Sequence, residues 1–301
     1  MTSGTEPAGP LLDVILGYDC NLACDYCTIS PAMRSRALPA AAVARALAEA
    51  VAEGFRRVQF TGGEPTLRAD LLPLVRRARA LGFDDVKLQS NGLLLGAGDN
   101  LRRLIDAGLS RLSISIHTHE ATAYESLVRR AGTHAAMVAG LRAAIAAGLP
   151  TRADVILQRS TMPRLQGALQ WLHGLGVRGA DLWFVSLTDH NRDNLDSMPR
   201  LREVVPTVRE ALAWARGHGF DVRSLHIPRC LLGDDHVHAF DPAAQGVRVV
   251  SPDARFDLRD SRLTGSVHVP ACNGCAFEAR CPGIRPDYLE RYGGEEFTAV
   301  R

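Results

Sequence analysis

Short apolar runs alternate with longer stretches of helical periodicity from residue 11 to about residue 218. The runs are rich in β-branched residues, which is typical of buried strands. Six of them are expected to form strands: "LLDVIL" from Leu11, "RVQF" from Arg57, "VKLQ" from Val86, "RLSISI" from Arg111, "RADVIL" from Arg152 and "ADLWFV" from Ala180. Regular alternation of strands and helices predicts a parallel sheet with right-handed crossovers. Periodicity alone leaves an open barrel and a flat doubly wound sheet as alternatives.

The stretches between these runs carry recognisable helix ends. Pro39 is placed to open the first helix and Gly54 to stop it. Further helices are expected to start near Asp99, Thr133 and Thr161. Each expected strand is therefore followed by a segment that can return the chain to the start of the next parallel strand.

The alternation stops after about residue 220. The remaining segment holds four of the seven cysteines, several Pro and Gly residues, and an expected hairpin around "VRVVSPDARFDL". We therefore divide the chain into a disordered N-terminus (residues 1–10), a core domain (residues 11–220) and a small C-terminal module (residues 221–301).

Composition narrows the function classes. The chain has 301 residues, 46% of them hydrophobic, and a formal net charge of +2 with acids and bases mixed throughout. Nucleic-acid binding is not expected, because no basic stripe is present. No apolar run approaches the roughly 20 residues that span a bilayer, so membrane association is not expected. We expect the protein to be cytoplasmic. Clustered cysteines in a reducing compartment favour metal binding or redox chemistry over disulfides.

Three of the cysteines stand in "GYDCNLACDYC", directly after the first expected strand. Loops at the carboxyl ends of parallel strands form the ligand sites of α/β folds. Cys20, Cys24 and Cys27 have the spacing C-x3-C-x2-C, with no fourth Cys or His nearby. Three thiolates suit zinc poorly, because structural zinc takes four ligands. They suit a [4Fe-4S] cluster whose fourth iron stays open.

This spacing resembles the signature of the radical S-adenosylmethionine (radical SAM) superfamily, which has an aromatic residue before the last cysteine, here Tyr26. The second expected strand ends in "TGGEPTLR", which resembles the family's second motif. The residues concerned are Thr61, Gly62, Gly63, Glu64 and Pro65. The resemblance implies that the turn and its carboxylate bind the ammonium group of SAM, and paired glycines allow the backbone to approach a ligand closely.

The third and fourth expected strands end in "QSNG" and "SISIHT". In the family, short polar residues at these ends contact the ribose and carboxylate of SAM, so the resemblance implies this role for Ser90, Asn91 and Ser115. His117 follows the fourth strand and is expected to face the cavity. The resemblance also implies the fold: an α/β partial (β/α)6 TIM-like barrel, open on one side to admit substrate, with a small C-terminal cysteine-rich auxiliary-cluster module.

The chemistry that the resemblance implies is radical formation. An electron, supplied by a reducing partner such as flavodoxin or ferredoxin, passes through the cluster into SAM and cleaves it to methionine and a 5'-deoxyadenosyl radical, which abstracts hydrogen from a substrate C–H bond. Cys20, Cys24 and Cys27 are then cluster ligands and not nucleophiles.

Four cysteines remain for the C-terminal module. Cys272, Cys275 and Cys281 have the spacing C-x2-C-x5-C, which resembles the centre of the SPASM extension of radical SAM enzymes. A further SPASM cysteine would stand at Arg285, so a shortened Twitch-like domain with Cys230 as fourth ligand fits better. One auxiliary [4Fe-4S] cluster with four protein ligands has no open iron, which implies electron transfer. A structural zinc site is the alternative.

Electron transfer by an auxiliary cluster favours a net oxidative modification, such as a cross-link or a dehydrogenation. The SPASM-like spacing favours a peptide substrate. Against it, only about ten residues precede the first strand, so a fused leader-peptide-binding domain is not expected, although a separate leader-peptide-binding protein could supply its role. A peptide and a small metabolite therefore both stay open as substrates. The alternative is the same radical core acting on a sugar, nucleoside or cofactor precursor, with zinc at the C-terminal cysteines. A remote alternative is a non-catalytic, zinc-stabilised binding protein.

Overall fold

The strands of the protein form one curved sheet. The computed structural model describes residues 8–261 and 266–301, so expected disorder at residues 1–7 lies outside the described residues. The order in the ten-stranded sheet is β10-β9-β1-β2-β3-β4-β5-β6-β7-β8. The strands are β1 (Leu11–Ile15), β2 (Arg57–Thr61), β3 (Asp85–Ser90), β4 (Arg111–Ser115), β5 (Thr151–Leu157), β6 (Gly179–Phe184), β7 (Asp221–Leu225), β8 (Ala239–Phe240), β9 (Val247–Val250) and β10 (Arg255–Asp257).

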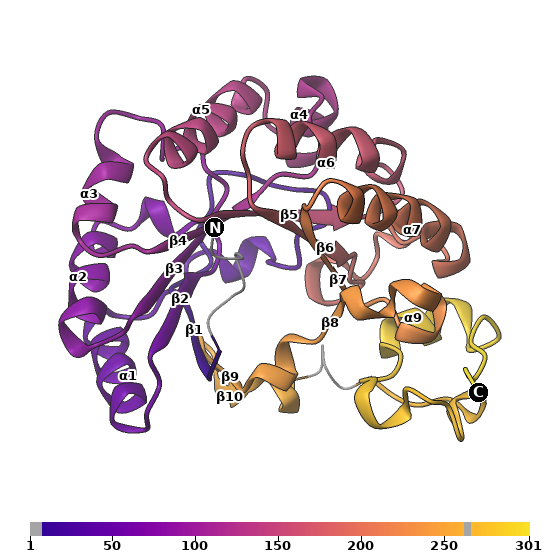
Figure 1. The fold of residues 1–301 in the computed structure, drawn as a ribbon. Coiled ribbons are helices and arrows are strands. Elements are labelled where there is room, and N and C mark those ends of the chain that lie inside the picture. Colours follow the sequence, from indigo (N-terminus) through magenta and orange to yellow (C-terminus); the bar gives the residue numbers. More distant parts are fainter. Residues whose placement is uncertain (1–7, 262–265) are drawn as a thin grey trace.

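Helices cover the outer, convex face of the sheet (Figure 1). They are α1 (Ala40–Ala52), α2 (Leu71–Leu81), α3 (Asn100–Asp106), α4 (Ala121–Val128), α5 (Thr133–Ala146), α6 (Leu165–Gly174), α7 (Leu201–Gly217), α8 (Arg229–Leu232) and α9 (Pro286–Tyr292). Each of the long helices presents an apolar stripe to the sheet. In α1 the stripe consists of Val43, Ala46, Leu47 and Ala50, all buried. Pro39 occupies the residue before α1, as expected.

The six expected strands are confirmed as β1 to β6, and they pair in parallel. The expected partial TIM-like barrel is also confirmed. The sheet is larger than expected, because β7 to β10 continue it with residues beyond 220. The hairpin is present as β9 and β10, and β9 pairs in parallel with β1. Since residues on both sides of 220 share one sheet, the division into domains at that point stays a prediction.

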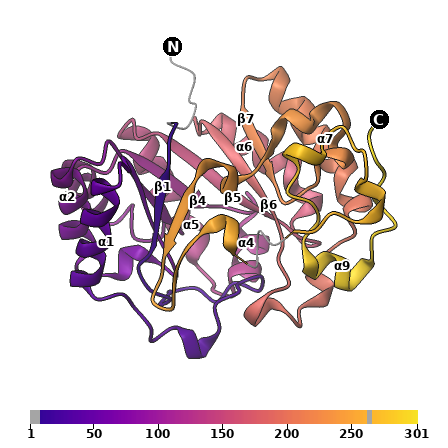
Figure 2. The same cartoon turned by 90° about the horizontal axis from the view of Figure 1, so that it is seen from below.

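The barrel is open between its two edge strands, β8 and β10. Figures 1 and 2 show the β9–β10 hairpin beside β1 on one side of this opening and the C-terminal segment with α9 on the other. Both edge strands are short, which limits unwanted pairing with other chains. Within the described residues, no helix is long and apolar enough to cross a membrane.

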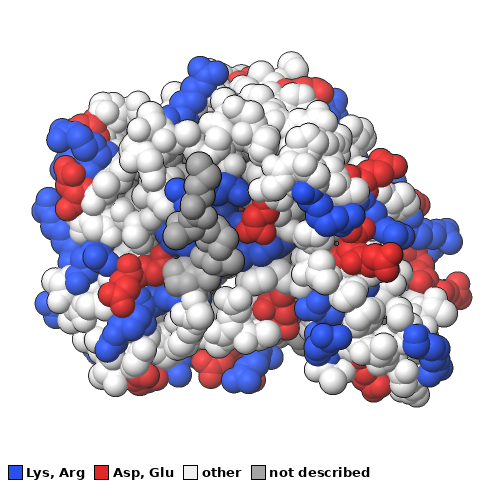
Figure 3. Space-filling view, viewed as in Figure 1, with Lys and Arg blue, Asp and Glu red and all other residues white. Residues whose placement is uncertain are grey.

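The concave face of the sheet is polar. Arg152 and Arg223 both donate hydrogen bonds to the buried Asp181 carboxylate, which joins β5, β6 and β7. Trp183 Nε1 donates to Asp154, at 3.2 Å. Burial, with the nearby Asp181 charge, raises the pKa of Asp154 to about 6. On the outside, Figure 3 shows acidic and basic side chains interspersed over the face in view, without a broad patch of one sign.

Candidate active site

The cysteine loop after β1 and the ends of three neighbouring strands enclose a cavity of about 370 Å³. Cys20, Cys24 and Cys27 line it from the loop. From the loop and from β2, β3 and β4 it is also lined by Tyr26, Thr61, Gly62, Gly63, Ser90, Asn91 and Ser115. The structure therefore brings together the residues that the sequence motifs singled out, except Glu64 and Pro65, which are not among the described residues that line this cavity.

The three thiols of the loop are half-buried. Burial raises the pKa of all three, that of Cys24 to about 12. A buried thiolate needs a compensating positive charge, which iron would supply. Three such thiols at one cavity fit a four-iron cluster, for which they would supply three of the protein ligands.

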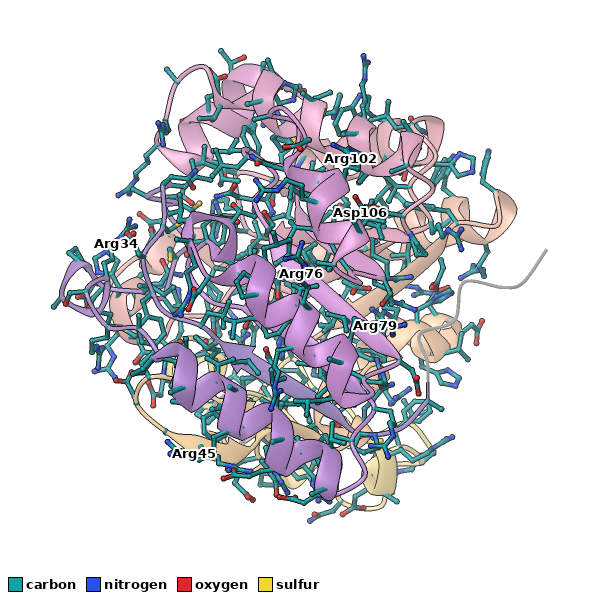
Figure 4. The ribbon with its side chains drawn as sticks, turned by 90° about the vertical axis from the view of Figure 1, so that its left-hand side faces the viewer. Arg34, Arg45, Arg76, Arg79, Arg102 and Asp106 are labelled. Atoms are coloured by element: carbon teal, nitrogen blue, oxygen red, sulfur yellow. The ribbon has the colours of Figure 1, made fainter. Side chains whose placement is uncertain are left out.

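Arg34 holds the backbone of the cysteine loop. Its guanidinium donates to the carbonyl oxygens of Cys20 and Leu22, each at 2.7 Å. Figure 4 shows Arg34 apart from Arg45 and Arg102, which project from the outer helices α1 and α3. Arg34 therefore serves the loop and is separate from the arginines of the outer helices.

Gly62 and Gly63 pack against the cysteine loop. A Cβ atom on Gly62, whose φ is +132°, would lie 2.2 Å from the Gly17 carbonyl oxygen. A Cβ atom on Gly63 would lie 2.1 Å from the Asp19 carbonyl oxygen. The Gly63 N–H donates to Gly17, at 2.9 Å. Only glycine lets the end of β2 come this close to the loop, so the glycine pair supports the residues just before the first cysteine.

Replacing Gly63 by Ala is expected to displace Asp19 and with it Cys20. We expect the iron content to fall by about four atoms per chain, the content of one [4Fe-4S] cluster, with circular dichroism unchanged. Gly174→Ala is the matched control, because nothing lies within 4 Å of a Cβ atom there. Full iron loading of the Gly63→Ala protein would contradict this account of the loop.

Glu64 lies behind the cavity wall, and its side chain is only 3% exposed. One carboxylate oxygen accepts from the Thr66 backbone N–H at 3.0 Å, the Thr66 hydroxyl at 2.6 Å and the Ser90 hydroxyl at 2.8 Å. The other accepts from the Asn91 backbone N–H at 2.7 Å. The carboxylate thus joins the end of β2 to the end of β3. Its expected contact with the SAM ammonium group, and that of Pro65 with SAM, stay predictions.

Asn91 ties the end of β3 to the cysteine loop. Its amide nitrogen donates to the Asn21 side chain at 2.7 Å, and its amide oxygen accepts from the Leu93 backbone N–H at 3.1 Å. Ser115 lines the cavity from β4. The expected contacts of Ser90, Asn91 and Ser115 with the ribose and carboxylate of SAM stay predictions.

His117 belongs to the cavity wall, and the motifs did not include it among the site residues. It lies two positions beyond Ser115, so the alternation of side chains along β4 places both on one face. The side chain is 4% exposed, and its Nε2 lies 2.5 Å from the Tyr26 hydroxyl oxygen. The signal that identifies it is therefore the two-residue period continued past the strand end.

The four remaining thiols gather in the C-terminal segment. Cys230, Cys272, Cys275 and Cys281 line one small cavity, and each is half-buried. Burial, together with the three neighbouring thiols, raises the pKa of Cys230 to about 11. This is the ligand set that the spacing suggested. Across residues 8–261 and 266–301, no three His, Cys, Asp or Glu side chains are arranged to share one metal ion.

Arg285, which stands where the SPASM pattern has a cysteine, joins the C-terminal segment to the core. Its guanidinium donates to the carbonyl oxygens of Phe184 (3.1 Å) and Val185 (2.7 Å), at the end of β6, and forms an ion pair with Asp287. The Asp287 carboxylate also accepts from the Leu187 backbone N–H, at 2.8 Å. Both charged side chains are nearly buried, so this residue is a structural link and not a ligand.

A second cavity, of about 770 Å³, lies between the loop after β6, the β9–β10 hairpin and α9. Its lining includes Arg192, Phe256 and Glu290. Asp189 lines both this cavity and the one at the cysteine loop. Its φ of +50° is unusual for a residue with a side chain, and such conformations concentrate at functional sites. The open side of the barrel therefore offers space for a substrate next to the candidate SAM site.

The sequence profile of the Radical SAM superfamily matches residues 14–172. That segment is more than half of the chain. It includes the cysteine loop and the ends of β2, β3 and β4 that line the first cavity.

Two curated relatives carry the same printed name. A "Probable GTP 3',8-cyclase" of Methanopyrus kandleri is 38% identical over 166 residues, which cover 53% of this chain and 52% of the relative. The chain thus spans about half the length of that relative. A protein of the same name from Sulfurisphaera tokodaii is 26% identical over 241 residues, covering 78% of this chain and 74% of the relative.

These relatives correct the functional expectation drawn from the cysteine spacing. The expected net oxidative modification of a peptide or small metabolite is wrong, because the relatives are named for an enzyme that acts on a nucleotide. A separate leader-peptide-binding protein as a possible partner stays a prediction. The alternative of a radical core acting on a nucleoside or cofactor precursor agrees better with these names.

Solved structures support the fold. Streptococcus suis SuiB bound to its precursor peptide SuiA matches with a TM-score of 0.71 at 13% identity, covering 97% of this chain and 75% of that one. The anSMEcpe protein with bound AdoMet and Kp18Cys peptide matches with a TM-score of 0.68 at 12% identity, covering 94% and 95%. At these identities the match concerns the fold alone.

Proposed function

Because this chain belongs to the radical SAM superfamily, we propose that it is a radical enzyme that acts on a purine nucleotide, with GTP as the first substrate to test. The observation that carries this proposal is the 26% identity over 78% of the chain to a relative named for GTP 3',8-cyclisation. That similarity extends well beyond residues 14–172, so it includes part of the chain outside the matched family segment.

The first cavity is the site for the cofactors. Cys20, Cys24 and Cys27 would hold the [4Fe-4S] cluster, and the ends of β2, β3 and β4 would hold SAM beside it. When bound, the pair supplies a SAM-derived radical that removes a hydrogen atom from the substrate. The chain itself contributes position: Arg34 and the glycine pair fix the loop, and Glu64 fixes the ends of β2 and β3.

The second cavity is the proposed substrate site. A nucleotide offers phosphate oxygens to a guanidinium group and base N–H donors to carboxylates. Glu290 and Asp260 are among the carboxylates of the lining. Arg285 is already bound to Asp287, whereas the exposed Arg192 makes no side-chain ion pair with any described residue. We assign phosphate binding to Arg192.

The C-terminal thiols complete the proposal. Cys230, Cys272, Cys275 and Cys281 supply four ligands, the number that an auxiliary [4Fe-4S] cluster takes from a protein. Such a cluster has no open iron and would exchange electrons with the substrate site, and an external reductant such as flavodoxin or ferredoxin would supply the first electron.

Deuterium transfer tests the proposed reaction. A bond between C3' and C8 of GTP requires that C3' lose its hydrogen. With GTP deuterated at C3', anaerobically iron-loaded enzyme, SAM and a reductant, we expect mass spectrometry to find deuterium in 5'-deoxyadenosine. Deuterium-free 5'-deoxyadenosine with no consumption of GTP would refute GTP as the substrate. Deuterium transfer from ATP deuterated at the same position, compared with that from GTP, shows whether the enzyme distinguishes guanine from adenine.

Replacing Arg192 by Ala is expected to raise the KM for GTP by about tenfold or more, because hydrogen bonds to charged groups contribute about 1.5–3 kcal/mol. Cleavage of SAM without substrate should stay unchanged. Arg45→Ala is the control, since Arg45 projects from α1 on the outer side of the barrel (Figure 4). An unchanged KM in the Arg192→Ala enzyme would remove this residue from the substrate site.

A further inference from the structure

The turn between β9 and β10 lies against the cysteine loop. β9 pairs in parallel with β1, and the two strands end side by side, with Val250 opposite Val14. Beyond these ends, the Tyr18 hydroxyl donates to the Asp253 carboxylate, at 2.8 Å. Asp253 stands in the turn, outside the segment that the Radical SAM profile matches. A contact between residues 235 positions apart therefore joins the C-terminal part of the chain to the loop that carries Cys20.

Tyr18 forms part of the wall of the first cavity, and it is only 7% exposed. The Arg36 guanidinium lies over the tyrosine ring, 5.4 Å from its centroid, which is within the range of a cation–π contact. Arg36 also donates to the other carboxylate oxygen of Asp253, at 2.5 Å. Neither charged residue is among the described residues that line the cavity. The ring is therefore held, at its hydroxyl and over one face, by groups outside the cavity that it lines.

Internal hydrogen bonds fix the turn that carries Asp253. The Ser251 hydroxyl accepts from the backbone N–H of Ala254 at 3.0 Å and from that of Asp253 at 3.3 Å. The Ser251 N–H donates to the Ala254 carbonyl oxygen, at 2.9 Å. In the adjoining strand β10, Arg255 forms an ion pair with Glu49 of α1, at 2.5 Å. Asp253 is thus presented to the cysteine loop by a closed turn whose hairpin is attached to α1.

We propose that Asp253 is a positioning residue for the binding of SAM, because it holds the Tyr18 ring in the cavity wall at the start of the cysteine loop. The glycine pair and Arg34 hold the backbone of this loop, whereas Asp253 holds a side chain that faces the cavity. If the ring leaves the wall in part of the molecules, the apparent dissociation constant of SAM rises by the inverse of the competent fraction. The inference rests on the proposed binding of the cluster and of SAM at the first cavity.

The measurement is the dissociation constant of SAM in iron-loaded protein, obtained from the change that SAM produces in the EPR signal of the reduced cluster. Asp253→Ala removes the acceptor of both hydrogen bonds, and we expect a dissociation constant about fivefold higher, the effect of about one net hydrogen bond. Iron content should not change, because the cysteines and the backbone contacts of the loop remain. Cleavage at saturating SAM should approach the wild-type rate, because bound SAM selects the competent loop.

Asp257→Ala is the matched control. Asp257 lies on the same hairpin, and its carboxylate forms an ion pair with Arg248 of β9. The Asp257 side chain is 47% exposed and that of Asp253 is 37% exposed. Both variants thus remove one partly exposed carboxylate from the hairpin, and they differ in the contact with Tyr18. The dissociation constant of SAM in Asp257→Ala protein should equal that of the wild type.

A second variant tests the same contact from the side of the loop. Tyr18→Phe removes the hydroxyl and keeps the ring, so the dissociation constant of SAM should rise, by no more than in Asp253→Ala. The double variant should equal Asp253→Ala alone, because the hydroxyl acts through the carboxylate. A wild-type dissociation constant in iron-loaded Asp253→Ala protein, even with a lower free energy of unfolding, would overturn the inference, as would additive effects in the double variant. If Asp253→Ala protein does not retain iron, an unchanged dissociation constant in Tyr18→Phe would overturn it.

The outcome separates this inference from the proposed function. Wild-type protein whose reduced cluster does not respond to SAM would refute the proposed SAM site, and the inference with it. A cluster that responds to SAM with the same dissociation constant in the presence and absence of the Asp253 carboxylate would refute the inference alone. Neither result depends on GTP.

Discussion

Replacing Cys27 by Ala is expected to abolish the cleavage of SAM. Changes to groups around a metal site commonly cost 10–100-fold, so loss of one of three ligands should cost more than about a hundredfold. The loop has no other thiol to substitute, because Cys20 and Cys24 are the remaining two at this cavity. The measurement is 5'-deoxyadenosine formed per chain under anaerobic reducing conditions, together with iron content.

Cys275→Ala is the matched cysteine variant, because its thiol is also half-buried and belongs to the other group of four. We expect it to retain cleavage of SAM without substrate and to lose product formation. If Cys275→Ala also stopped this cleavage while the fold stayed intact, the division of labour between the two thiol groups would be refuted.

Replacing Arg285 by Ala is expected to lower the free energy of unfolding by about 3–5 kcal/mol, because Asp287 would be left as a buried charge without its partner. Two backbone carbonyls at the end of β6 would also lose their donor. Urea unfolding of the iron-loaded protein, followed by tryptophan fluorescence, gives the size of the effect. Product formation should fall as well, because Arg285 and Asp287 line the second cavity.

Two further variants interpret this result. Arg285→Lys keeps the positive charge but lacks the planar guanidinium group that donates to two acceptors at once. We therefore expect its free energy of unfolding to lie between those of the wild type and of Arg285→Ala. Arg102→Ala breaks an exposed ion pair with Asp99 and should cost less than about 1 kcal/mol. Stability of Arg285→Ala equal to that of the wild type would show that the ion pair does not hold the C-terminal segment to the core.

The sequence predicted the strands whose outward faces are apolar. In β1 to β6 apolar residues that pack on the helices alternate with polar residues of the concave face. β7 has the same charged concave face, with Asp221 and Arg223 bound to Arg152 and Asp181 on β5 and β6, but it also carries the polar Ser224 beside Val222 and was not predicted. Such charges look like loop residues in the sequence, because their partners are distant in the chain. The parallel pairing of β9 with β1 was not predicted either, because the two strands are distant in the chain and no sequence pattern near either one indicates its partner.

The sequence motifs predicted the residues of the site that belong to those motifs. The cysteines and the strand-end residues face one cavity, because parallel strands end at one edge of a sheet. The function of each motif residue was less predictable. The Glu64 carboxylate is a group that commonly binds cations, yet it accepts four hydrogen bonds that link the end of β2 to the end of β3. Asp189 joins the two cavities from a loop without any motif, and only the three-dimensional fold brings it there.

The pairing of β9 with β1 has a consequence for biosynthesis. Val247 to Val250 complete one side of the strand that leads into the cysteine loop. The ribosome adds about 5–20 residues per second, so β9 is synthesised on the order of ten seconds or more after Cys27. Until then β1 lacks its β9 partner. During this interval the thiols are carried by a nascent chain whose first strand has an open edge. Iron that reaches the finished polypeptide would therefore bind a cysteine loop whose preceding strand is already paired on both sides. Iron that binds during translation would bind the loop before β9 has paired with that strand.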